Sequence, residues 1–245
     1  MSQNRSQGLP ILLIQVRNPR DPMNQHEEEC IAEHVGAGFV VTAHNAVNTP
    51  LSEEVLHHYA GIVIGGSGDY SVHHPKSRPW TLPLQRFIER ALTLNVPGFG
   101  LCFGHQLLGT VLGATVKTEP AKSEVGTIHL DLTEMGRQDP VFGGLSPTFP
   151  VHTGHSDYVI EVPTGVTLLA TSPRVKTQAF QVSGSSFYST QFHPDLTGAQ
   201  ARERYLAYKA HIRAPSPQGE LLFEPGKDEA TSLLRRFAQQ LPQRP

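Results

Sequence analysis

One cysteine, Cys102, lies where an apolar stretch at residues 94–99 gives way to an apolar helical run at residues 107–112. Its immediate setting is Gly100-Leu101-Cys102-Phe103-Gly104. A strand, a sharp turn with small residues on both sides of a nucleophile, and a helix make up the nucleophile elbow, here with sulfur in place of oxygen. The glycines permit a strained turn, and the positive end of a helix that begins at Phe103 favours a thiolate. The alternative is a buried cysteine in a glycine-containing turn.

Of the thirteen histidines, His193 has the setting of a general base. Residues 186–192 alternate and are rich in β-prone side chains, so we expect a strand that ends at Pro194. Side chains at positions i and i+2 of an extended chain point to the same side, which would place Asp195 beside His193. A nucleophilic cysteine needs a base, and the base needs an orienting group. A His-Pro-Asp sequence alone is equally typical of a turn, but with Cys102 it predicts a Cys102–His193–Asp195 triad.

The pattern of apolar segments indicates an α/β fold. Strands are expected at residues 11–16, 39–43 and 61–64, and helices at 27–35, 51–59 and 82–94, with Ser52 or Thr49 as cap of the second helix. This alternation predicts a parallel sheet with helices on both faces. Further along, short strands are expected at 126–132, 148–151, 166–170, 178–182 and 186–192, then helices at 198–212 and 228–241 joined by a linker at 214–226. We expect one domain over residues 1–245, with a core at about 10–196 and a helical appendage at 197–245.

The carboxyl ends of the strands are where open α/β sheets bind ligands. Gly66 and Gly68 follow the third expected strand and can bring backbone N–H groups close to a substrate. The N–H of Phe103 follows the nucleophile directly, as the donor of an oxyanion hole does. The glycines also fit an ordinary turn, whereas a phosphate-binding loop is disfavoured because no G-x-x-x-x-G-K-[ST] pattern follows.

Composition excludes several other classes of protein. The net charge is −2 and no basic stripe interleaved with aromatic residues occurs, so we expect no nucleic-acid partner. No apolar run approaches membrane-spanning length, and the polar N-terminus has no signal-like core. Two cysteines, Cys30 and Cys102, are too few for a disulfide framework and indicate a reducing, cytoplasmic setting. The histidines form no metal-binding motif, so we expect neither metal nor cofactor.

The order and spacing of these segments resemble a class I glutamine amidotransferase domain, most of all the glutaminase part of GMP synthetase and its stand-alone relatives. The matching segments are Gly65–Asp69, Pro97–Leu108, Ser123–Gly126, Gly154–Asp157 and Gln191–Asp195. The resemblance implies a flavodoxin-like three-layer sandwich with a mostly parallel central sheet and an antiparallel extension. It also implies a Cys-His-acid triad, although the family usually has Glu where this chain has Asp195.

The resemblance further implies a reaction. Cys102 would attack the γ-carboxamide of glutamine or of another γ-glutamyl compound and form a thioester, with Gly66 and Phe103 as oxyanion donors. Gln106 would bind the amino-acid end of the substrate, and the backbone at Ser156 and Asp157 its α-amino and α-carboxylate groups. His155 and the adjacent segment fit a plain turn equally well.

Three functions remain open at this point. In the first, the chain is a glutaminase that passes ammonia to a synthetase. That synthetase would be on another chain, because no phosphate-binding motif of an ATP-dependent domain follows residue 196. Alternatively, it is a self-sufficient hydrolase of γ-glutamyl peptides. The third possibility is a catalytically dormant binding or regulatory protein. The only feature that favours it is Asp195, which stands where the family usually has Glu.

Overall fold

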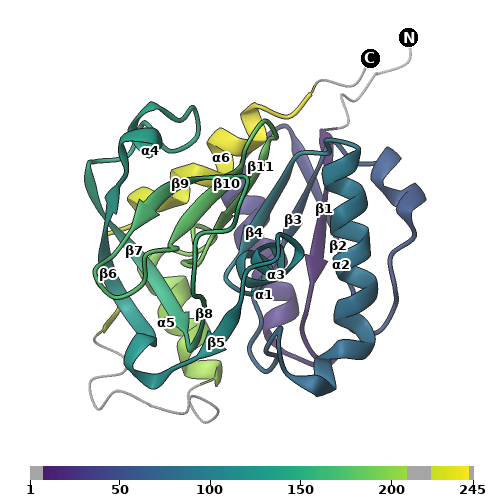
Figure 1. Ribbon diagram of the computed structural model, residues 1–245, viewed down its shortest axis with the longest axis horizontal. Coiled ribbons are helices and arrows are strands. Elements are labelled where there is room, and N and C mark those ends of the chain that lie inside the picture. The colour runs from purple at the N-terminus through teal and green to yellow at the C-terminus, as the bar shows by residue number, and fades with distance from the viewer. Residues whose placement is uncertain (1–7, 209–221, 243–245) are drawn as a thin grey trace.

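The computed structural model describes residues 8–208 and 222–242, and a nine-stranded sheet runs through this part of the chain (Figure 1). The strand order is β2-β1-β3-β4-β11-β10-β9-β6-β7. The parallel strands are β1 (Leu9–Gln15), β2 (Phe39–Asn45), β3 (Gly61–Ile64), β4 (Gly98–Leu101) and β11 (Phe187–Thr190). The antiparallel extension consists of β10 (Ala179–Val182), β9 (Val166–Thr171), β6 (Glu124–Leu132) and β7 (Thr148–His155). The expected mostly parallel sheet with an antiparallel extension is therefore confirmed.

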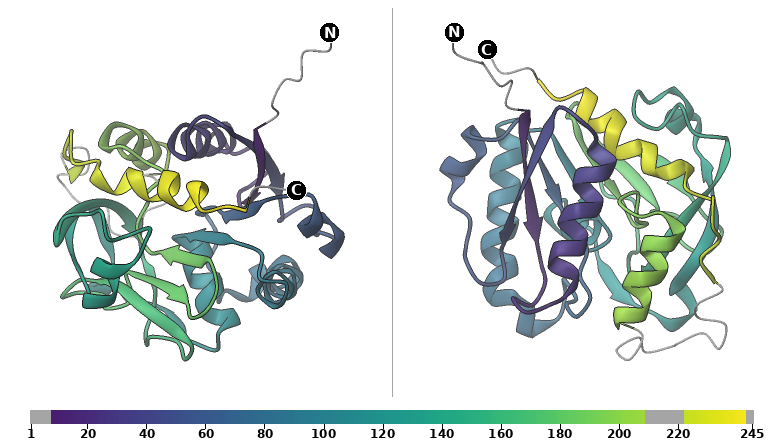
Figure 2. Two further views of the ribbon diagram at one scale, coloured as in Figure 1. Left: turned by 90° about the horizontal axis from the view of Figure 1, so that it is seen from above. Right: turned by 180° about the vertical axis from the view of Figure 1, so that it is seen from behind.

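Helices cover both faces of this sheet (Figure 2). One face carries α1 (Met23–Val35), α5 (Gly198–Tyr208) and α6 (Ser232–Gln239), and the other carries α2 (Arg78–Thr93) and α3 (Phe103–Val111). A separate two-stranded sheet pairs β5 (Val116–Thr118) with β8 (Asp157–Val159). The other short helices in the described part of the chain are α4 (Glu134–Gln138) and the 3₁₀ helices η1 (Glu53–His57), η2 (Pro75–Ser77), η3 (Pro120–Lys122) and η5 (Glu229–Thr231).

Two hydrophobic cores lie against the two faces of the sheet. One includes Ile31 of α1 and Phe237 of α6, and the other includes Phe87 of α2 and Leu107 of α3. Strands β3 and β4 are buried along their whole length, which explains their continuous apolar sequences. No helix in residues 8–208 or 222–242 is long and apolar enough to cross a bilayer.

Two glycines set how closely the elements around Cys102 pack. A Cβ on Gly98 would collide with the ring of Phe187 on the neighbouring strand β11. A Cβ on Gly104 would lie 2.5 Å from the carbonyl oxygen of Ile64, so its absence lets α3 approach β3. The nucleophile elbow is therefore seated directly on the central parallel strands.

Several expected boundaries were wrong. The helix expected at 51–59 is only the five-residue η1, which buries a single side chain, Leu56; Ser52 does cap it, accepting from the N–H of Glu54 at 3.4 Å. The helix expected at 82–94 already begins at Arg78, where Pro79 fits the first turn. Of the last two helices, α5 is described to residue 208 and the other is divided into η5 and α6. Of the expected linker at 214–226, residues 214–221 lie outside the described residues.

The strand expected at 186–192 is also shorter, since β11 ends at Thr190. Residues 191–195 form bends and a turn rather than extended chain. His193 and Asp195 are therefore brought together by a turn, not by the alternation of a strand.

Candidate active site

The carboxyl ends of β1, β3, β4 and β11 lie at one edge of the sheet because these strands run parallel. Immediately beyond these ends come Arg17, Gly66, Cys102 and His193 respectively. The topology therefore gathers the expected nucleophile, the expected base and the glycine turn in one place.

Cys102 has the strained backbone of a nucleophile elbow. Its φ of 47° and ψ of −92° place it, with Asn95, among the only non-glycine residues of positive φ in the described part of the chain. Two hydrogen bonds hold this conformation: the N–H of Cys102 donates to the carbonyl of Thr190 at 2.8 Å, and the N–H of Gln106 donates to the carbonyl of Cys102 at 3.1 Å. The sulfur thus lies at the N-terminus of α3.

The thiol of Cys102 is nevertheless not activated in this arrangement. Burial raises the pKa of Cys102 to about 12, with the carboxylates of Asp157 and Asp195 adding to the effect and Arg17 and Arg204 opposing it. The expected preference for thiolate at the helix N-terminus is therefore outweighed by desolvation. Within the described residues no hydrogen bond joins the sulfur to His193; instead Gln191 Nε2 donates to Sγ at 3.6 Å.

His193 and Asp195 form a pair, and Arg204 joins them. Nδ1 of His193 lies 3.0 Å from Oδ1 of Asp195, and Nη1 of Arg204 donates to Oδ2 at 2.8 Å. Burial alone would raise the pKa of Asp195, but Arg204 and His193 outweigh it and hold that pKa well below its usual range. An ionised carboxylate only accepts, so Nδ1 carries the proton and Nε2 is left for proton exchange.

Two glycines in the turn after β3 allow neighbouring side chains to pack closely against its backbone. A Cβ on Gly66 would lie 2.9 Å from Cε1 of His193, and one on Gly68 would collide with the ring of Tyr208. These two positions therefore place the imidazole and helix α5 against the turn.

The two expected oxyanion donors differ in their availability. Phe103 is the first residue of α3, so its N–H has no acceptor within the helix. The N–H of Gly66 instead donates to Oε1 of Glu27 at 3.1 Å. Glu27 is completely buried and also accepts from Arg17 at 2.9 and 3.1 Å. The N–H of Gly66 is therefore already bonded to a buried carboxylate in this arrangement, and its role as an oxyanion donor stays a prediction.

A cavity of about 300 Å³ opens above the sulfur. Five of the six expected substrate-binding and oxyanion residues line it, namely Gly68, Phe103, Gln106, Ser156 and Asp157, whereas Gly66 does not. Nε2 of Gln106 donates to the backbone oxygen of Asp157 at 2.9 Å and to Oε1 of Gln191 at 3.3 Å. A chain of hydrogen bonds thus runs from Cys102 through Gln191 and Gln106 to Asp157.

The Asp157 side chain is already paired, and its carboxylate accepts from the hydroxyls of Ser71 and Thr118. His155, at the end of β7, has Nδ1 3.0 Å from the backbone oxygen of Asp157 and Nε2 3.0 Å from Glu124. The segment is therefore the end of one strand and the start of another, held by a buried His155–Glu124 pair, rather than a plain turn. Residues 154–157 all line the cavity.

Sequence reasoning missed four residues of this site: Arg17, Glu27, Gln191 and Arg204. Gln191 belongs to the segment that includes His193, which could have singled it out. Arg204 and Glu27 lie on α5 and α1, and no local pattern marks them. Residues 8–208 and 222–242 include no group of three His, Cys, Asp or Glu side chains suited to a metal, and Cys30 and Cys102 are both free.

The comparisons with known proteins agree with one another on the family. The family model for glutamine amidotransferase class-I matches residues 28–212. One subunit of the glutamine-hydrolyzing GMP synthase of Sulfolobus acidocaldarius is 32% identical over 151 residues, which is 62% of this chain and 75% of that protein. The glutamine-hydrolyzing GMP synthase of Streptomyces avermitilis is 30% identical over 76% of this chain but only 33% of its own length. The crystal structure of a glutamine amidotransferase from Thermotoga maritima superposes with a TM-score of 0.76 at 21% identity, covering 96% of this chain and 97% of that one, which supports the fold.

Proposed function

The chain belongs to the class-I glutamine amidotransferase family of enzymes, and from this we propose that it hydrolyses γ-glutamyl amides, glutamine among them, through a thioester on Cys102. The observation that supports this most is the strained backbone of Cys102 at the same sheet edge as the His193–Asp195 pair. The names of the relatives, which describe glutamine-hydrolysing synthases, support glutamine as a substrate.

In the first step Nε2 of His193 takes the proton from Sγ of Cys102 as the sulfur attacks the γ-carbonyl carbon. The proton transfer has to accompany substrate binding, because the pKa of the free thiol is raised to about 12. The N–H of Phe103 stabilises the oxyanion. The N–H of Gly66 can serve as a second donor only after it leaves Glu27.

In the second step the C–N bond breaks and His193 returns the proton to the leaving nitrogen. Water then attacks the thioester, His193 takes its proton, and the C–S bond breaks to release glutamate and restore the thiol. Asp195 orients the imidazole and stabilises its cation throughout. Gln106 and the Ser156–Asp157 backbone hold the amino-acid end of the substrate in the larger cavity.

For glutamine, the ammonia released is available to a synthetase. The archaeal relative is named as one subunit of its synthase, which supports a separate synthetase chain as the recipient. The two free cysteines fit a reducing compartment, and we place the enzyme in the cytoplasm.

The test is glutamate release from glutamine by the wild type and by Cys102→Ala. We expect turnover to disappear in Cys102→Ala while the circular dichroism spectrum is unchanged. Cys30→Ala is the control for the loss of a buried free thiol, because the sulfur of Cys30 contacts His26 and Cys30 does not line the cavity that holds Cys102. Retained turnover in a clean Cys102→Ala preparation would show that another group is the nucleophile. Absence of turnover in the wild type on every γ-glutamyl amide tested would favour the dormant binding protein.

A further inference from the structure

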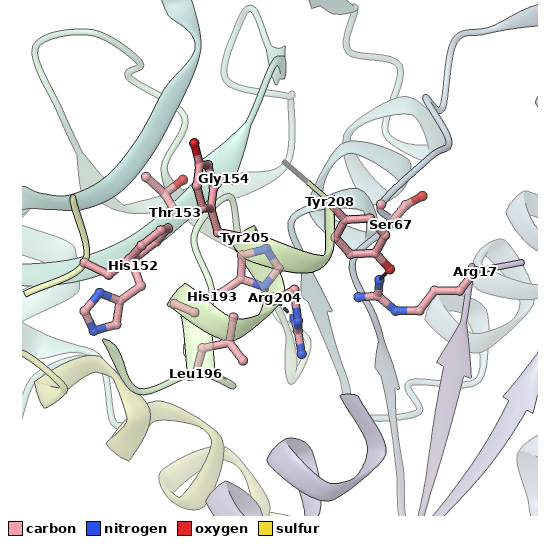
Figure 3. Close-up of a pocket in the computed structure, with 13 residues that line it drawn as sticks. Arg17, Ser67, His152, Thr153, Gly154, His193, Leu196, Arg204, Tyr205 and Tyr208 are labelled. Atoms are coloured by element: carbon pink, nitrogen blue, oxygen red, sulfur yellow. Dashed lines mark hydrogen bonds between the residues drawn. The ribbon is translucent and has the colours of Figure 1, made fainter. Parts of the chain in front are cut away.

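The sulfur of Cys102 accepts a hydrogen bond from a residue that has no part in the mechanism above. Nε2 of Gln191 donates to Sγ at 3.6 Å, and within the described residues this is the only hydrogen bond to the sulfur. His193 lines a separate cavity of about 100 Å³, where Figure 3 shows its ring beside Arg204. The group that contacts the sulfur before substrate binds is therefore an amide and not the imidazole.

The orientation of the Gln191 amide follows from a backbone carbonyl. The backbone oxygen of Asp157 can only accept, so the NH₂ group of Gln106 faces it, at 2.9 Å. The same NH₂ group donates to Oε1 of Gln191 at 3.3 Å. Because the oxygen of the Gln191 amide faces Gln106, its NH₂ group is directed at the sulfur of Cys102.

The backbone on both sides of this contact is fixed as well. The N–H of Cys102 donates to the carbonyl of Thr190 at 2.8 Å, which ties the nucleophile to the residue that precedes Gln191. The N–H of Gln191 donates to the carbonyl of Gln178, also at 2.8 Å. Gln191 is 0% exposed, so water does not compete for its side-chain donor. The amide is thus held against the sulfur by both its backbone and its oxygen.

A donor in this position has its largest effect when the sulfur is negatively charged. A thiol is a weak acceptor, whereas a hydrogen bond to a charged atom is about twice as strong as one between neutral groups. The sulfur carries negative charge when its proton has gone to His193 and the bond to carbon is not yet complete. It does so again when the C–S bond breaks and the electron pair returns to it. A fixed N–H stabilises both states relative to the thiol and the thioester.

We propose that Gln191 is a catalytic residue whose amide N–H stabilises negative charge on the sulfur of Cys102, and that Gln106 is the positioning residue that orients this amide. The proposal rests on the proposed function and adds a donor to the nucleophile itself. The thiol proton goes to His193 as the C–S bond forms, and His193 returns a proton to the sulfur as that bond breaks. Gln191 neither gains nor loses a proton in these steps.

The experiment measures the rate at which iodoacetamide alkylates Cys102 between pH 7 and pH 10 in a Cys30→Ala background. Gln191→Met keeps the length of the side chain and removes its donor. We expect alkylation to slow about tenfold at each pH, because a hydrogen bond to a charged group contributes roughly this factor. A decrease of less than about threefold in the folded variant would overturn the proposal.

Gln178→Met is the matched control, since Gln178 is also 0% exposed but donates to Glu124 and Ser172 instead of the sulfur. Equal slowing in the two folded variants would show that the contact with the sulfur is not the cause, and would overturn the proposal. Both variants leave unchanged the charged groups that act on the sulfur, which are Asp157, Asp195, Arg17 and Arg204.

Gln106→Met tests the positioning role, and it decides the matter should Gln191→Met not fold. Alkylation is measured without substrate, so a loss of substrate binding does not affect it. Without the NH₂ group of Gln106 the Gln191 amide can turn, and we expect alkylation to slow at least threefold. An unchanged rate would overturn the positioning role. In the double variant we expect no slowing beyond that of Gln191→Met, because both changes remove one interaction; multiplied losses would contradict this.

Turnover separates this proposal from the proposed function. In Gln191→Met we expect kcat for glutamate release from glutamine to fall about tenfold, with KM within twofold of the wild type because Gln191 does not line the cavity above the sulfur. Slow alkylation with an unchanged kcat would overturn the catalytic role of Gln191. A wild type that hydrolyses no γ-glutamyl amide would reject the proposed function, whereas the alkylation rates would still report whether Gln191 stabilises the thiolate.

Discussion

Arg204 donates through Nη1 to Oδ2 of Asp195 at 2.8 Å, and both side chains are buried. The other oxygen of Asp195 faces Nδ1 of His193 at 3.0 Å, so the carboxylate lies between a permanent cation and the imidazole. Asp195 is one methylene shorter than the glutamate that is usual in the family. The turn after β11 brings its backbone close enough to reach His193, and Arg204 fixes its second oxygen.

Replacing Arg204 by Ala tests the consequence for the chemistry. The pKa of Asp195 is held well below its usual range by Arg204 and His193 against the effect of burial. Without the guanidinium, the pKa of Asp195 rises toward its usual range, so the carboxylate that orients His193 is protonated at a higher pH. We therefore expect the acid limb of the kcat/KM pH profile to move to higher pH, together with a loss of stability of about 3 kcal/mol.

The measurement is the pH profile and urea denaturation of Arg204→Ala, with Arg204→Lys as the conservative variant. We expect Arg204→Lys to restore part of the profile because the positive charge remains. Arg202→Ala, exposed on the same helix, is the control. A pH profile of Arg204→Ala that coincides with the wild type would mean that Arg204 only supports the fold.

Removing the base should cost more than removing its orienting group. Asp195→Asn retains an imidazole that can exchange protons, whereas His193→Ala does not. We expect kcat to fall further in His193→Ala, as measured by steady-state glutamate release at saturating substrate. Equal losses would mean that Asp195 does more than orient His193.

The unliganded thiol should react slowly with neutral alkylating reagents. Because burial raises the pKa of Cys102 to about 12, the thiolate is scarce at neutral pH. In a Cys30→Ala background, we expect the rate of iodoacetamide alkylation to increase steadily from pH 7 to pH 10 without a plateau. Fast alkylation that is independent of pH between 6 and 8 would instead reveal a thiolate–imidazolium pair in the free enzyme.

Short sequence patterns predicted those features of the molecule whose geometry depends on residues close together in the chain. The elbow at Cys102 follows from a short segment with strong turn chemistry, and Cys102 has the expected strained backbone. His193 and Asp195 do pair, but through a turn and not through the strand alternation from which the pairing was predicted. The three-residue β5 was missed because two of its residues, Lys117 and Thr118, are exposed and give no apolar pattern.

The partners of the site could not be predicted in this way. Glu27 reaches the N–H of Gly66 from 39 residues away, and Arg204 reaches Asp195 only because α5 packs beneath the turn. Such contacts depend on how the helices pack against the sheet. Because a charged residue on a helix is normally solvated, the sequence does not mark either residue as part of a buried site. The occupied N–H of Gly66 was thus inaccessible to an argument from the glycine motif alone.

Crowding at Gly66 gives a prediction about the position of His193. In Gly66→Ala the new Cβ would lie 2.9 Å from Cε1 of His193, so the imidazole has to shift. We expect kcat to fall about a hundredfold, since small displacements of a catalytic group have effects of this order. Gly109→Ala is the control: its Cβ would lie equally close, at 2.9 Å, to Cγ2 of Val159 in the core. Similar losses of kcat in the two folded variants would contradict the specific role of Gly66.

The last prediction concerns His105, which follows the elbow and is completely buried. Its Nδ1 lies 2.9 Å from the hydroxyl of Ser189, and its ring packs 4.6 Å from that of Phe180. Desolvation lowers the pKa of His105 from 6.5 to about 3. Between these values the unfolded chain binds a proton that the folded protein does not, so the stability of the fold decreases as the pH falls from 6.5 toward 3.

Acidification from pH 6.5 to 5 should therefore cost the wild type about 2 kcal/mol through His105 alone. In His105→Gln, which does not titrate, we expect that part of the pH dependence to disappear, even if the variant is less stable at every pH. Urea denaturation at both pH values measures the difference, with His129→Gln, at an exposed position, as the control. Should His105→Gln lose as much stability between pH 6.5 and 5 as the wild type, His105 would have to be protonated in the folded protein, which its apolar surroundings oppose.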